Sequence, residues 1–450
     1  METPNGKAKD RFSMAEIRPF QGIHYNENFI PDISSVICPP YDIITSEMAI
    51  HLNQRSSYNF VRIEHGEQLP SDNDEDNKYT RSAKKLERWL REGILKRNEL
   101  PAIYLHQHLF RYHGEKYLRR GIIVAVRLED WDKMIIRPHE STRGKPKDDR
   151  LKLLWSLNAN TSPVFAIYEN HGGEIASILS QKEKDPPFIE LDSNGDEHRV
   201  WAITDTEEIS QVSGHLSHHP LYIADGHHRY ESALNYKKER LACSPSPSGE
   251  EGFNFVMMEL VDLSDRGLII LSPHRLVRGI SHLTLGQLKN RLAAVFQTEE
   301  IPLDTSDIPR QVNNLLKEGH TDAVRVVIFG PSTDKLMVLK LREIDRASQM
   351  LPYFHSSLYK RLDVSIVDHI ILEKMLGLTG DQEETSLDFH HDIAVTVEQV
   401  MKRECQLALF LRPTRTEVIK AIADSGDRMP RKSTYFYPKP PSGLILRQLD

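Results

Sequence analysis

The sequence has few cysteines and no long apolar run. Cys38, Cys243 and Cys405 are its only cysteines among 450 residues, and none of them belongs to a C-x-x-C pair. This spacing argues against a disulfide framework or a structural zinc site, so we expect three buried thiols that behave as small hydrophobic side chains. No stretch approaches the roughly 18 to 20 apolar residues of a membrane helix, and the polar start METPNGKAKDRFS has no signal-peptide core. A cytoplasmic protein without a membrane partner is expected.

An excess of positive charge is also lacking. The chain has 58 Lys and Arg against 65 Asp and Glu, a formal net charge of -7 at pH 7. The protein as a whole therefore lacks the positive field that gives general affinity for nucleic acid, and nucleic acid is not expected as a partner. Apolar residues at 39% and charged residues at 27% are typical of a globular protein. No Walker loop is present, so a phosphate site would have to be built from another motif.

The periodicity of apolar residues predicts an α+β fold, with mixed and mainly antiparallel sheets and flanking helices. Strand pairs are expected around residues 113–115 and 264–267, and a helix is expected over 79–95. The length favours two or three structural units, and the Pro- and Ser-rich stretch 243–252 is the best boundary. The predicted parts are 14–245, which carries the candidate site, 253–415, a second α+β part, and 416–450, a tail that packs back on the core.

The stretch LYIADGHHRYESAL, residues 221–234, places two histidines and an arginine between an apolar run and a helical pattern. Its first four residues are expected to form a buried strand, followed by a turn at Asp225-Gly226 and a helix from His227. Asp225 can cap this helix, and Gly226 lets the backbone approach a ligand closely. The inner face of the helix would carry Tyr230, Ala233 and Leu234.

A helix start offers N–H groups and the positive end of the helix dipole, so phosphate is the natural occupant of this turn. Arg229 and either histidine could add donors. The alternative is a capped helix whose histidines satisfy local polar groups. A metal is the weakest option, because adjacent helical side chains point about 100° apart and His227 and His228 would not comfortably share one ion.

A second polar segment, residues 135–154, is IIRPHESTRGKPKDDRLKLL. So many acids, bases and phosphate donors in one loop fit a site built on a scaffold. The alternative is a charged surface loop that caps a helix from Asp149. The candidate residues are Arg137, His139, Glu140, Thr142, Lys147, Asp148 and Arg150.

A third segment, VICPPYDIITSE, holds Asp42 just after paired prolines, which suits a carboxylate that must be kept still. Alternatively it is a rigid turn before a helix capped by Thr45 or Ser46. The next polar residues along the chain are Asn59, Arg62 and Glu64. Their spacing predicts that they lie roughly on one face of a strand, either as part of the site or as an ordinary solvated face.

The last segment, MPRKSTYFYPKPPSG at 429–443, combines basic and hydroxyl side chains with three aromatic residues. Lys432, Ser433 and Thr434 are candidates for phosphate contacts beside Arg431. Docking of the tail alone would also explain the aromatic residues.

Seven of these motifs together resemble one family. RPFQGIHYN, PPYDII, YNFVRIE, IRPHESTRGKPKDDRLKLL, ADGHHRYESAL, SPHRLV and MPRKSTYFYPKPPSGL occur in the order seen in the bacterial and archaeal family called domain of unknown function 1015. The turn at 225–229 is also similar to the phosphate-binding turn of the ParB/sulfiredoxin superfamily, whose free-serine kinases carry Asp-Gly-His-His-Arg. All five residues match here.

This second resemblance implies a ParB/sulfiredoxin-like core around the turn and a nucleotide or phosphate bound at 225–229. His227 stands where sulfiredoxins keep their cysteine, so sulfinic-acid repair is not implied. No segment resembles the basic DNA-binding region of ParB proteins. The kinases imply a carboxylate that deprotonates a serine hydroxyl, and we take its candidates from the polar segments: Asp42, Glu64 and Glu140.

Together these features predict a phosphotransfer enzyme that acts on a small hydroxyl substrate, with free serine preferred, and uses ADP or ATP with Mg²⁺ and no structural metal. A phosphatase acting on phosphoserine or a similar small phosphoester is one alternative, and a ParB-like nucleotide-binding regulatory protein without turnover is another. The sequence leaves the oligomeric state open. The predicted catalytic residues are His227, His228, Glu140 and Asp42. The predicted phosphate- or nucleotide-binding residues are Asp225, Gly226, His228, Arg229, Arg137, His139, Lys147, Arg150, Lys432, Ser433 and Thr434.

Overall fold

A computed structural model describes residues 15–449 of the chain, except 143, 171–172, 194, 245, 319–322 and 333. The chain forms two compact units that interleave along the sequence. The predicted parts were continuous, whereas both units are discontinuous, and the last residues of the chain belong to the first unit. Unit 1 consists of Met1–Arg137, Arg143–Leu268 and Pro438–Asp450, and unit 2 consists of Pro138–Thr142 and Ile269–Tyr437.

The main sheet of unit 1 has the strand order β6-β11-β8-β12-β5-β4-β10-β9, with β1 also paired to β5. The pairs β6-β11 and β8-β12 are parallel, and the other pairs are antiparallel. The predicted α+β class with mixed, mainly antiparallel pairing is therefore confirmed. The strands are β1 (Ile17–Arg18), β4 (Ile103–Tyr112), β5 (Glu115–Arg127), β6 (Ile136–Arg137), β8 (Val164–Tyr168), β9 (Ile189–Ser193), β10 (Asp196–Ile203), β11 (Leu221–Asp225) and β12 (Phe255–Asp262).

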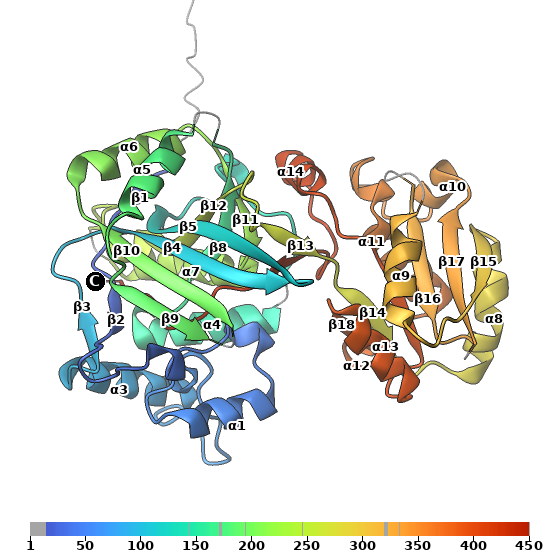
Figure 1. Cartoon of the computed structure of the whole chain (residues 1–450), viewed down its shortest axis with the longest axis horizontal. Coiled ribbons are helices and arrows are strands. Elements are labelled where there is room, and N and C mark those ends of the chain that lie inside the picture. The colour runs from blue at the N-terminus through green and yellow to red at the C-terminus, as the bar shows by residue number, and fades with distance from the viewer. Residues whose placement is uncertain are drawn as a thin grey trace, which may run out of the picture. The chain divides into compact units, whose positions relative to one another are not determined.

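Both faces of this sheet are buried, because helices cover each of them (Figure 1). In the figure, α5 and α6 lie on one side of the sheet and α1 and α3 on the other. Side chains of α4 contribute to the cores on both faces. The helices of unit 1 are α1 (Ser46–Arg55), α2 (Val61–Glu64), α3 (Lys78–Arg91), α4 (Gly144–Leu157), α5 (Glu174–Lys182), α6 (Thr206–Leu216) and α7 (His227–Cys243).

The C-terminal segment 438–449 is woven into unit 1 by backbone hydrogen bonds. Ser442 N–H donates to the Cys38 carbonyl at 2.8 Å, and β21 (Arg447–Gln448) pairs with β7 (Ala159–Asn160). Gly443 has a φ of +95°, and a Cβ there would lie 2.8 Å from the Phe60 ring. A glycine is therefore required where the segment crosses Phe60. The short pair β2 (Ile23–Tyr25) and β3 (Leu95–Arg97) completes this side of the unit.

Unit 2 contains an antiparallel sheet in the order β15-β17-β16-β19-β14-β18. Helices α9 and α13 contribute to the core on one of its faces. Strands β16 and β17 pair with each other antiparallel. The elements are β13 (Ile269–Leu271), β14 (His274–Val277), α8 (His282–Ala293), β15 (Phe296–Pro302), α9 (Ile308–Lys317), β16 (Arg325–Phe329), β17 (Lys335–Leu341), α10 (Ile344–Ser348), α11 (Asp363–Ile366), the π-helix Val367–Met375, α12 (Asp381–Ser386), β18 (Leu387–His390), α13 (Ile393–Met401), β19 (Leu407–Phe410), α14 (Thr416–Asp424) and β20 (Tyr435–Tyr437).

Several local predictions are wrong. The strands on either side of 264–267 form, but they do not pair with each other: β12 pairs with β5 and β8, and β13 pairs with β20. Glu64 ends the short helix α2 instead of lying on a strand. Asp149 lies inside α4 and does not cap it. Cys243 is exposed, while the other two cysteines are buried as expected.

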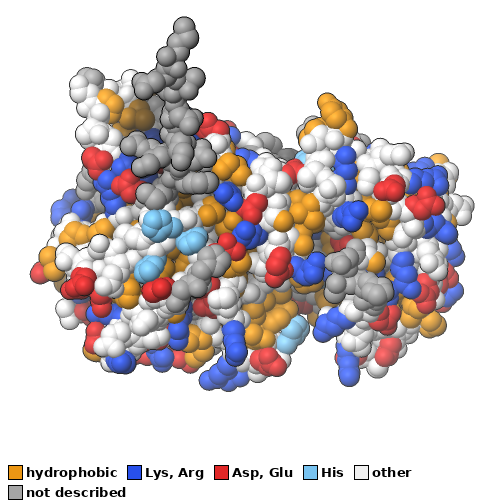
Figure 2. Space-filling view, turned by 90° about the horizontal axis from the view of Figure 1, so that it is seen from above, with side chains coloured by type: hydrophobic (Ala, Val, Ile, Leu, Met, Phe, Trp, Pro, Cys, Tyr) orange, Lys and Arg blue, Asp and Glu red, His pale blue; other side chains and the backbone are white. Residues whose placement is uncertain are grey.

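Among the described residues, no helix is both long and apolar enough to cross a membrane. On the face of the molecule in Figure 2, Lys and Arg side chains are interspersed with Asp and Glu and form no large patch of one sign.

Two glycines of unit 1 should respond oppositely to alanine. Gly214 lies in α6 with open space around it, so Gly214→Ala should raise the free energy of unfolding by about 0.5 kcal/mol. A Cβ on Gly267 would lie 2.6 Å from the Leu118 carbonyl oxygen and the Arg119 nitrogen, so Gly267→Ala should lower it by about 1–3 kcal/mol.

Chemical denaturation followed by tryptophan fluorescence measures both effects in unit 1, because all four tryptophans belong to that unit. They are Trp89, Trp131, Trp155 and Trp201. Equal stability of the two variants would contradict the crowding at residue 267.

Candidate active site

The turn between β11 and α7 has the predicted strand-turn-helix form. Gly226 has a φ of +89° and is the N-cap of α7, with no side-chain cap. Asp225 directly precedes this cap residue, and its Oδ2 accepts a hydrogen bond from Arg229 Nη2 at 2.7 Å. The predicted inner face is confirmed as buried. It comprises Tyr230, Ala233 and Leu234.

Arg229 folds back over Gly226. A Cβ at residue 226 would lie 2.8 Å from Arg229 Nε and 2.9 Å from Nη2. Nη1 also donates to Ser162 Oγ at 3.2 Å and to the Pro163 carbonyl. A glycine is therefore needed at residue 226 both for the positive φ and to leave room for the Arg229 side chain. The guanidinium is held by three partners.

Lys439, from the C-terminal segment, enters the same turn. Its Nζ contacts Asp42 Oδ2 and, at 2.8 Å, Asp225 Oδ1, and its side chain is 5% exposed. Burial disfavours its charge, but Asp225 and Asp42 outweigh that effect and raise the pKa of Lys439. Arg119 Nη1 holds the preceding Pro438 carbonyl at 2.8 Å. Lys439 thus joins two predicted site residues that are 183 positions apart in sequence, at 42 and 225.

Arg150 anchors a second set of charges on α4. Its Nε and Nη2 donate to Asp149 Oδ2 at 3.0 and 2.5 Å, and its guanidinium lies 4.0 Å from the centre of the Tyr41 ring. Lys78 Nζ and Tyr79 Oη donate to Asp149 Oδ1 at 2.6 and 2.8 Å. Burial opposes ionisation of Asp149, yet Arg150 and Lys78 lower its pKa to about 2.

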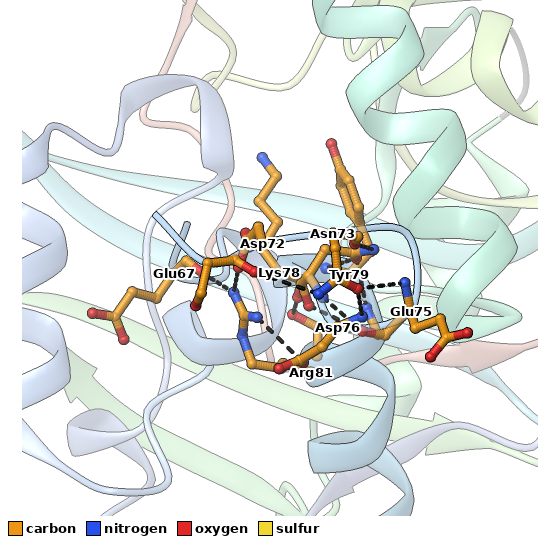
Figure 3. Close-up of polar contacts among 12 residues, drawn as sticks. Glu67, Asp72, Asn73, Glu75, Asp76, Lys78, Tyr79 and Arg81 are labelled. Carbon is orange, nitrogen blue, oxygen red and sulfur yellow. Dashed lines mark hydrogen bonds and ion pairs between the residues drawn. The ribbon is translucent and has the colours of Figure 1, made fainter. Parts of the chain in front are cut away.

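Lys78 and Tyr79 reach Asp149 from the start of α3. Figure 3 shows both side chains extending away from the acidic loop before the helix, where Arg81 instead binds Asp72 at 2.6 Å and Asp76 at 3.3 Å. Arg81 thus pairs with two of the loop's carboxylates, while Lys78 and Tyr79 contact Asp149 of α4.

Glu64 connects the two sets of charges. Its side chain is fully buried, and its Oε1 accepts from Arg150 Nη1 at 3.4 Å and from Ser162 Oγ at 3.2 Å. Ser162 also accepts from Arg229, as described above. We call the whole set the ion-pair chain, and its four carboxylates balance its four cations. Its members are Asp42, Lys439, Asp225, Arg229, Ser162, Glu64, Arg150, Asp149 and Lys78.

Other predicted residues of unit 1 lie around this chain. His227 is buried and His228 half-buried in the first turn of α7. Arg137 Nε donates to the Met134 carbonyl at 2.8 Å, and its guanidinium lies 5.6 Å from the Tyr222 ring. Lys147 is on α4, which packs against α7, and its Nζ is 3.9 Å from a carboxylate oxygen on α7.

The predicted residues at 139–142 and 432–434 belong to unit 2, where four of them contact one another. His139 Nε2 lies 2.9 Å from Thr434 Oγ1, and Ser433 N–H donates to Glu140 Oε1 at 3.1 Å. Lys432 has a φ of +56° in the same loop. These contacts hold segment 138–142 against segment 429–434 within unit 2.

Lys439 and Ser162 were missed by the sequence analysis. Lys439 lies in a quoted motif, and its position between two prolines in Tyr-Pro-Lys-Pro-Pro could have marked it as a side chain held in place. No local pattern distinguishes Ser162.

A buried histidine cluster, also missed, lies on the sheet of unit 1. His106 Nδ1 is 2.8 Å from Glu259 Oε1, and His106 Nε2 is 3.0 Å from His198 Nδ1. Arg119 Nη2 donates to His108 Nδ1 at 3.2 Å. Burial lowers the pKa of His108 and of His198 well below the ordinary value, and Arg119 lowers both further. Both histidines are therefore neutral at pH 7.

Fold and site together define an α+β protein whose glycine-capped strand-to-helix turn carries a partly buried ion-pair chain. The chain belongs to the family described as protein of unknown function (DUF1015), whose model matches residues 17–365. This confirms the family predicted from the motifs. No curated protein matches the chain.

Solved structures offer distant likenesses. A free serine kinase in complex with AMP is 11% identical, over 70% of this chain and 86% of its own, with a TM-score of 0.34. A conserved hypothetical protein from Pyrococcus furiosus is 12% identical, over 73% and 95%, with a TM-score of 0.36. SbnI with a C-terminal truncation, from Staphylococcus aureus, is 11% identical, over 72% and 87%, with a TM-score of 0.34.

Removing Lys439 should destabilise unit 1. Lys439→Met leaves Asp42 and Asp225 facing each other without their shared cation, which should lower the free energy of unfolding by about 2–3 kcal/mol. Adding Asp42→Asn should restore part of that loss, since one of the two negative charges disappears. Lys432→Met, at an exposed lysine of unit 2, is the control for the same chemical change. A Lys439→Met variant as stable as this control would contradict the stabilising role of Lys439 between Asp42 and Asp225.

The histidine cluster predicts acid sensitivity in unit 1. His108 and His198 have lowered pKa values in the folded state, so the unfolded chain binds protons first as the pH falls below 6.5. Their contribution to stability is complete above pH 6.5 and is lost progressively below it. Asp196, whose pKa is raised to about 6 by burial, acts in the opposite direction between about pH 6 and 4.

Fluorescence-detected unfolding between pH 7 and pH 5 measures how the free energy of unfolding changes with pH. A variant with both His108→Gln and His198→Gln should lose most of the pH dependence, whereas His51→Gln, at an exposed site in α1, should retain it. An unchanged slope in the double variant would show that other groups cause the acid sensitivity.

Proposed function

We propose that the protein is a phosphotransfer enzyme that binds the phosphates of ADP or ATP at the Asp225–Arg229 turn and acts on a small hydroxyl substrate, with free serine preferred. The observation that carries this proposal is that a long helix begins at a glycine cap beside two cations, Arg229 and Lys439, whose side chains are only 10% and 5% exposed. Helix N–H groups, the helix dipole and these cations together favour an anion with several oxygens. We also propose that this turn binds phosphate as the corresponding turn does in the ParB/sulfiredoxin superfamily.

Asp225 is the carboxylate that both cations share in the absence of a ligand. Phosphate oxygens at the helix start would compete with it for Arg229 and Lys439, so these side chains can move from one anion to another without losing charge compensation. His228, half-buried in the first helical turn, is better placed than the buried His227 to meet a ligand. It would help to neutralise the transferring group.

Asp42 is the preferred general base among the three candidates. Its side chain is 22% exposed and contacts Lys439 at the turn, while Glu64 is fully buried and Glu140 belongs to unit 2. Asp42 could therefore accept the proton of a substrate hydroxyl that lies beside the bound phosphate. Lys439 would hold this carboxylate in place.

Mg²⁺ fits this site only as a partner of the nucleotide. Among the described residues, no three His, Cys, Asp or Glu side chains are arranged to hold a metal ion. Asp225, whose cations would turn to the phosphates, is a carboxylate of the kind Mg²⁺ accepts when phosphates and water supply its other ligands. Bound there, the ion would offset charge on the transferring phosphoryl group.

Incubation with Mg²⁺, ADP or ATP and L-serine, followed by mass spectrometry, tests the proposal. Phosphoserine should form, and Arg229→Gln should reduce its rate by about 100-fold or more, because a charged donor to the transferring phosphate is lost. Arg199→Gln, at a surface ion pair on β10, is the matched control and should keep the wild-type rate. Release of phosphate from phosphoserine without a nucleotide would support the phosphatase instead. Nucleotide binding without any product would favour the regulatory alternative and contradict the enzyme.

A further inference from the structure

A small cavity lies beside the ion-pair chain in unit 1. Its volume is about 40 Å³, and Glu64, Ser162 and Arg229 form part of its wall together with apolar side chains of α4. One water needs roughly 10–15 Å³ of such space, so the cavity has room for about three waters or a chemical group of similar size.

Glu64 is a carboxylate of the ion-pair chain with a buried oxygen that has no partner. Its Oε2 is buried and has no hydrogen-bond partner, and its Oε1 accepts only the two contacts of 3.2 and 3.4 Å. Asp149, which shares Arg150 with Glu64, accepts four hydrogen bonds of 2.5 to 3.0 Å. Arg150 therefore serves mainly Asp149, and Glu64 remains a buried carboxylate with spare accepting capacity.

A buried carboxylate oxygen without a partner lowers stability unless a ligand supplies the missing hydrogen bond. A buried polar atom without a partner costs roughly 1–3 kcal/mol, and a charged one costs more. The charges of the ion-pair chain are already balanced, so what Glu64 Oε2 lacks is a hydrogen-bond donor. A primary ammonium makes strong, charge-assisted hydrogen bonds to a carboxylate, and its remaining N–H groups can use the hydroxyls of Thr161 and Ser162 in the same wall.

Ser162 relates this cavity to the turn. Its hydroxyl donates to Glu64 and accepts from Arg229, so a single side chain separates the carboxylate from the arginine of the proposed phosphate site. A ligand that reaches Glu64 with one end would therefore have its other end near Arg229.

We propose that Glu64 binds the ammonium group of the small hydroxyl substrate and so determines its class, an amino alcohol or a hydroxy amino acid. This inference rests on the proposed function for the reaction at the hydroxyl, but the binding of the amine stands apart from turnover. Glu64 acts here as a specificity residue, while Asp42 remains the preferred base.

Calorimetric titration with three probes tests the inference in the full-length protein. L-serine and ethanolamine carry the ammonium group, and glycerate carries a hydroxyl in its place. The wild type should bind L-serine at least tenfold more tightly than glycerate, because a site built for an ammonium donor rejects an analogue that has a neutral hydroxyl in its place. Glu64→Gln should weaken serine binding at least tenfold and leave glycerate unchanged, so the preference disappears.

Glu259→Gln is the matched control. Glu259 is equally buried and also has one oxygen without a partner, but it is not part of the cavity wall. This variant should keep the preference for serine, and tryptophan fluorescence confirms that both variants are folded.

The outcomes separate the two proposals. Equal affinity for serine and glycerate, a preference that survives Glu64→Gln, or no binding of any probe would each overturn the inference, the last meaning that the cavity holds water only. Selective amine binding without phosphoserine formation would support the role of Glu64 in binding the ammonium group and refute the proposed kinase activity. Phosphoserine formation with the same KM for serine in Glu64→Gln would refute the role of Glu64 and leave the enzyme standing.

Discussion

The sharing of Asp225 by Arg229 and Lys439 is the interaction on which the rest of the site depends. An isolated buried charge costs several kcal/mol, so each cation needs a carboxylate and each carboxylate needs a cation. This requirement draws the last residues of the chain, the Pro-Pro-Tyr-Asp turn near its start and the β11-α7 turn into one place. Arg119 links the C-terminal segment to the sheet, because its guanidinium binds both the Pro438 carbonyl and His108. The position of Lys439 is therefore coupled to the buried histidine cluster.

The sequence predicted those parts of the fold whose causes are local. The strand, glycine turn and helix at 221–234 and the hairpin around 113–115 follow from apolar periodicity and turn residues, and both are present. The pairing of β12 was wrong for a nonlocal reason. Its run Phe-Val-Met-Met-Glu-Leu-Val is buried on both faces, as in a central strand, and such a strand takes its partners from distant parts of the chain. A turn after it does not require a hairpin.

The candidate site divides in the same way. Asp42 and Arg229 could be named because each stands in a distinctive local motif, whereas the residue that joins Asp42 to Asp225 comes from position 439 and left only a proline-flanked lysine as a signal. Glu64 shows how spacing misleads. Polar residues at 59, 62 and 64 fit one face of a strand, but here a buried Asn59 precedes a single helical turn, and that turn delivers Glu64 to the interior. Short segments carry too few residues for periodicity to separate these cases.

The distribution of hydrogen bonds along the ion-pair chain bears on what a ligand could change. Arg229 and Lys439 both pair with Asp225, so an anion at the turn would compete with that carboxylate for the two cations. Glu64 is the opposite case, since Arg150 is held by Asp149 and cannot serve it fully without leaving that carboxylate. The two ends of the site therefore differ in kind. The turn end offers cations whose partner can be replaced, and the Glu64 end offers an acceptor that is incomplete. A molecule with an anionic or transferring group at one end and a cationic donor at the other would satisfy both.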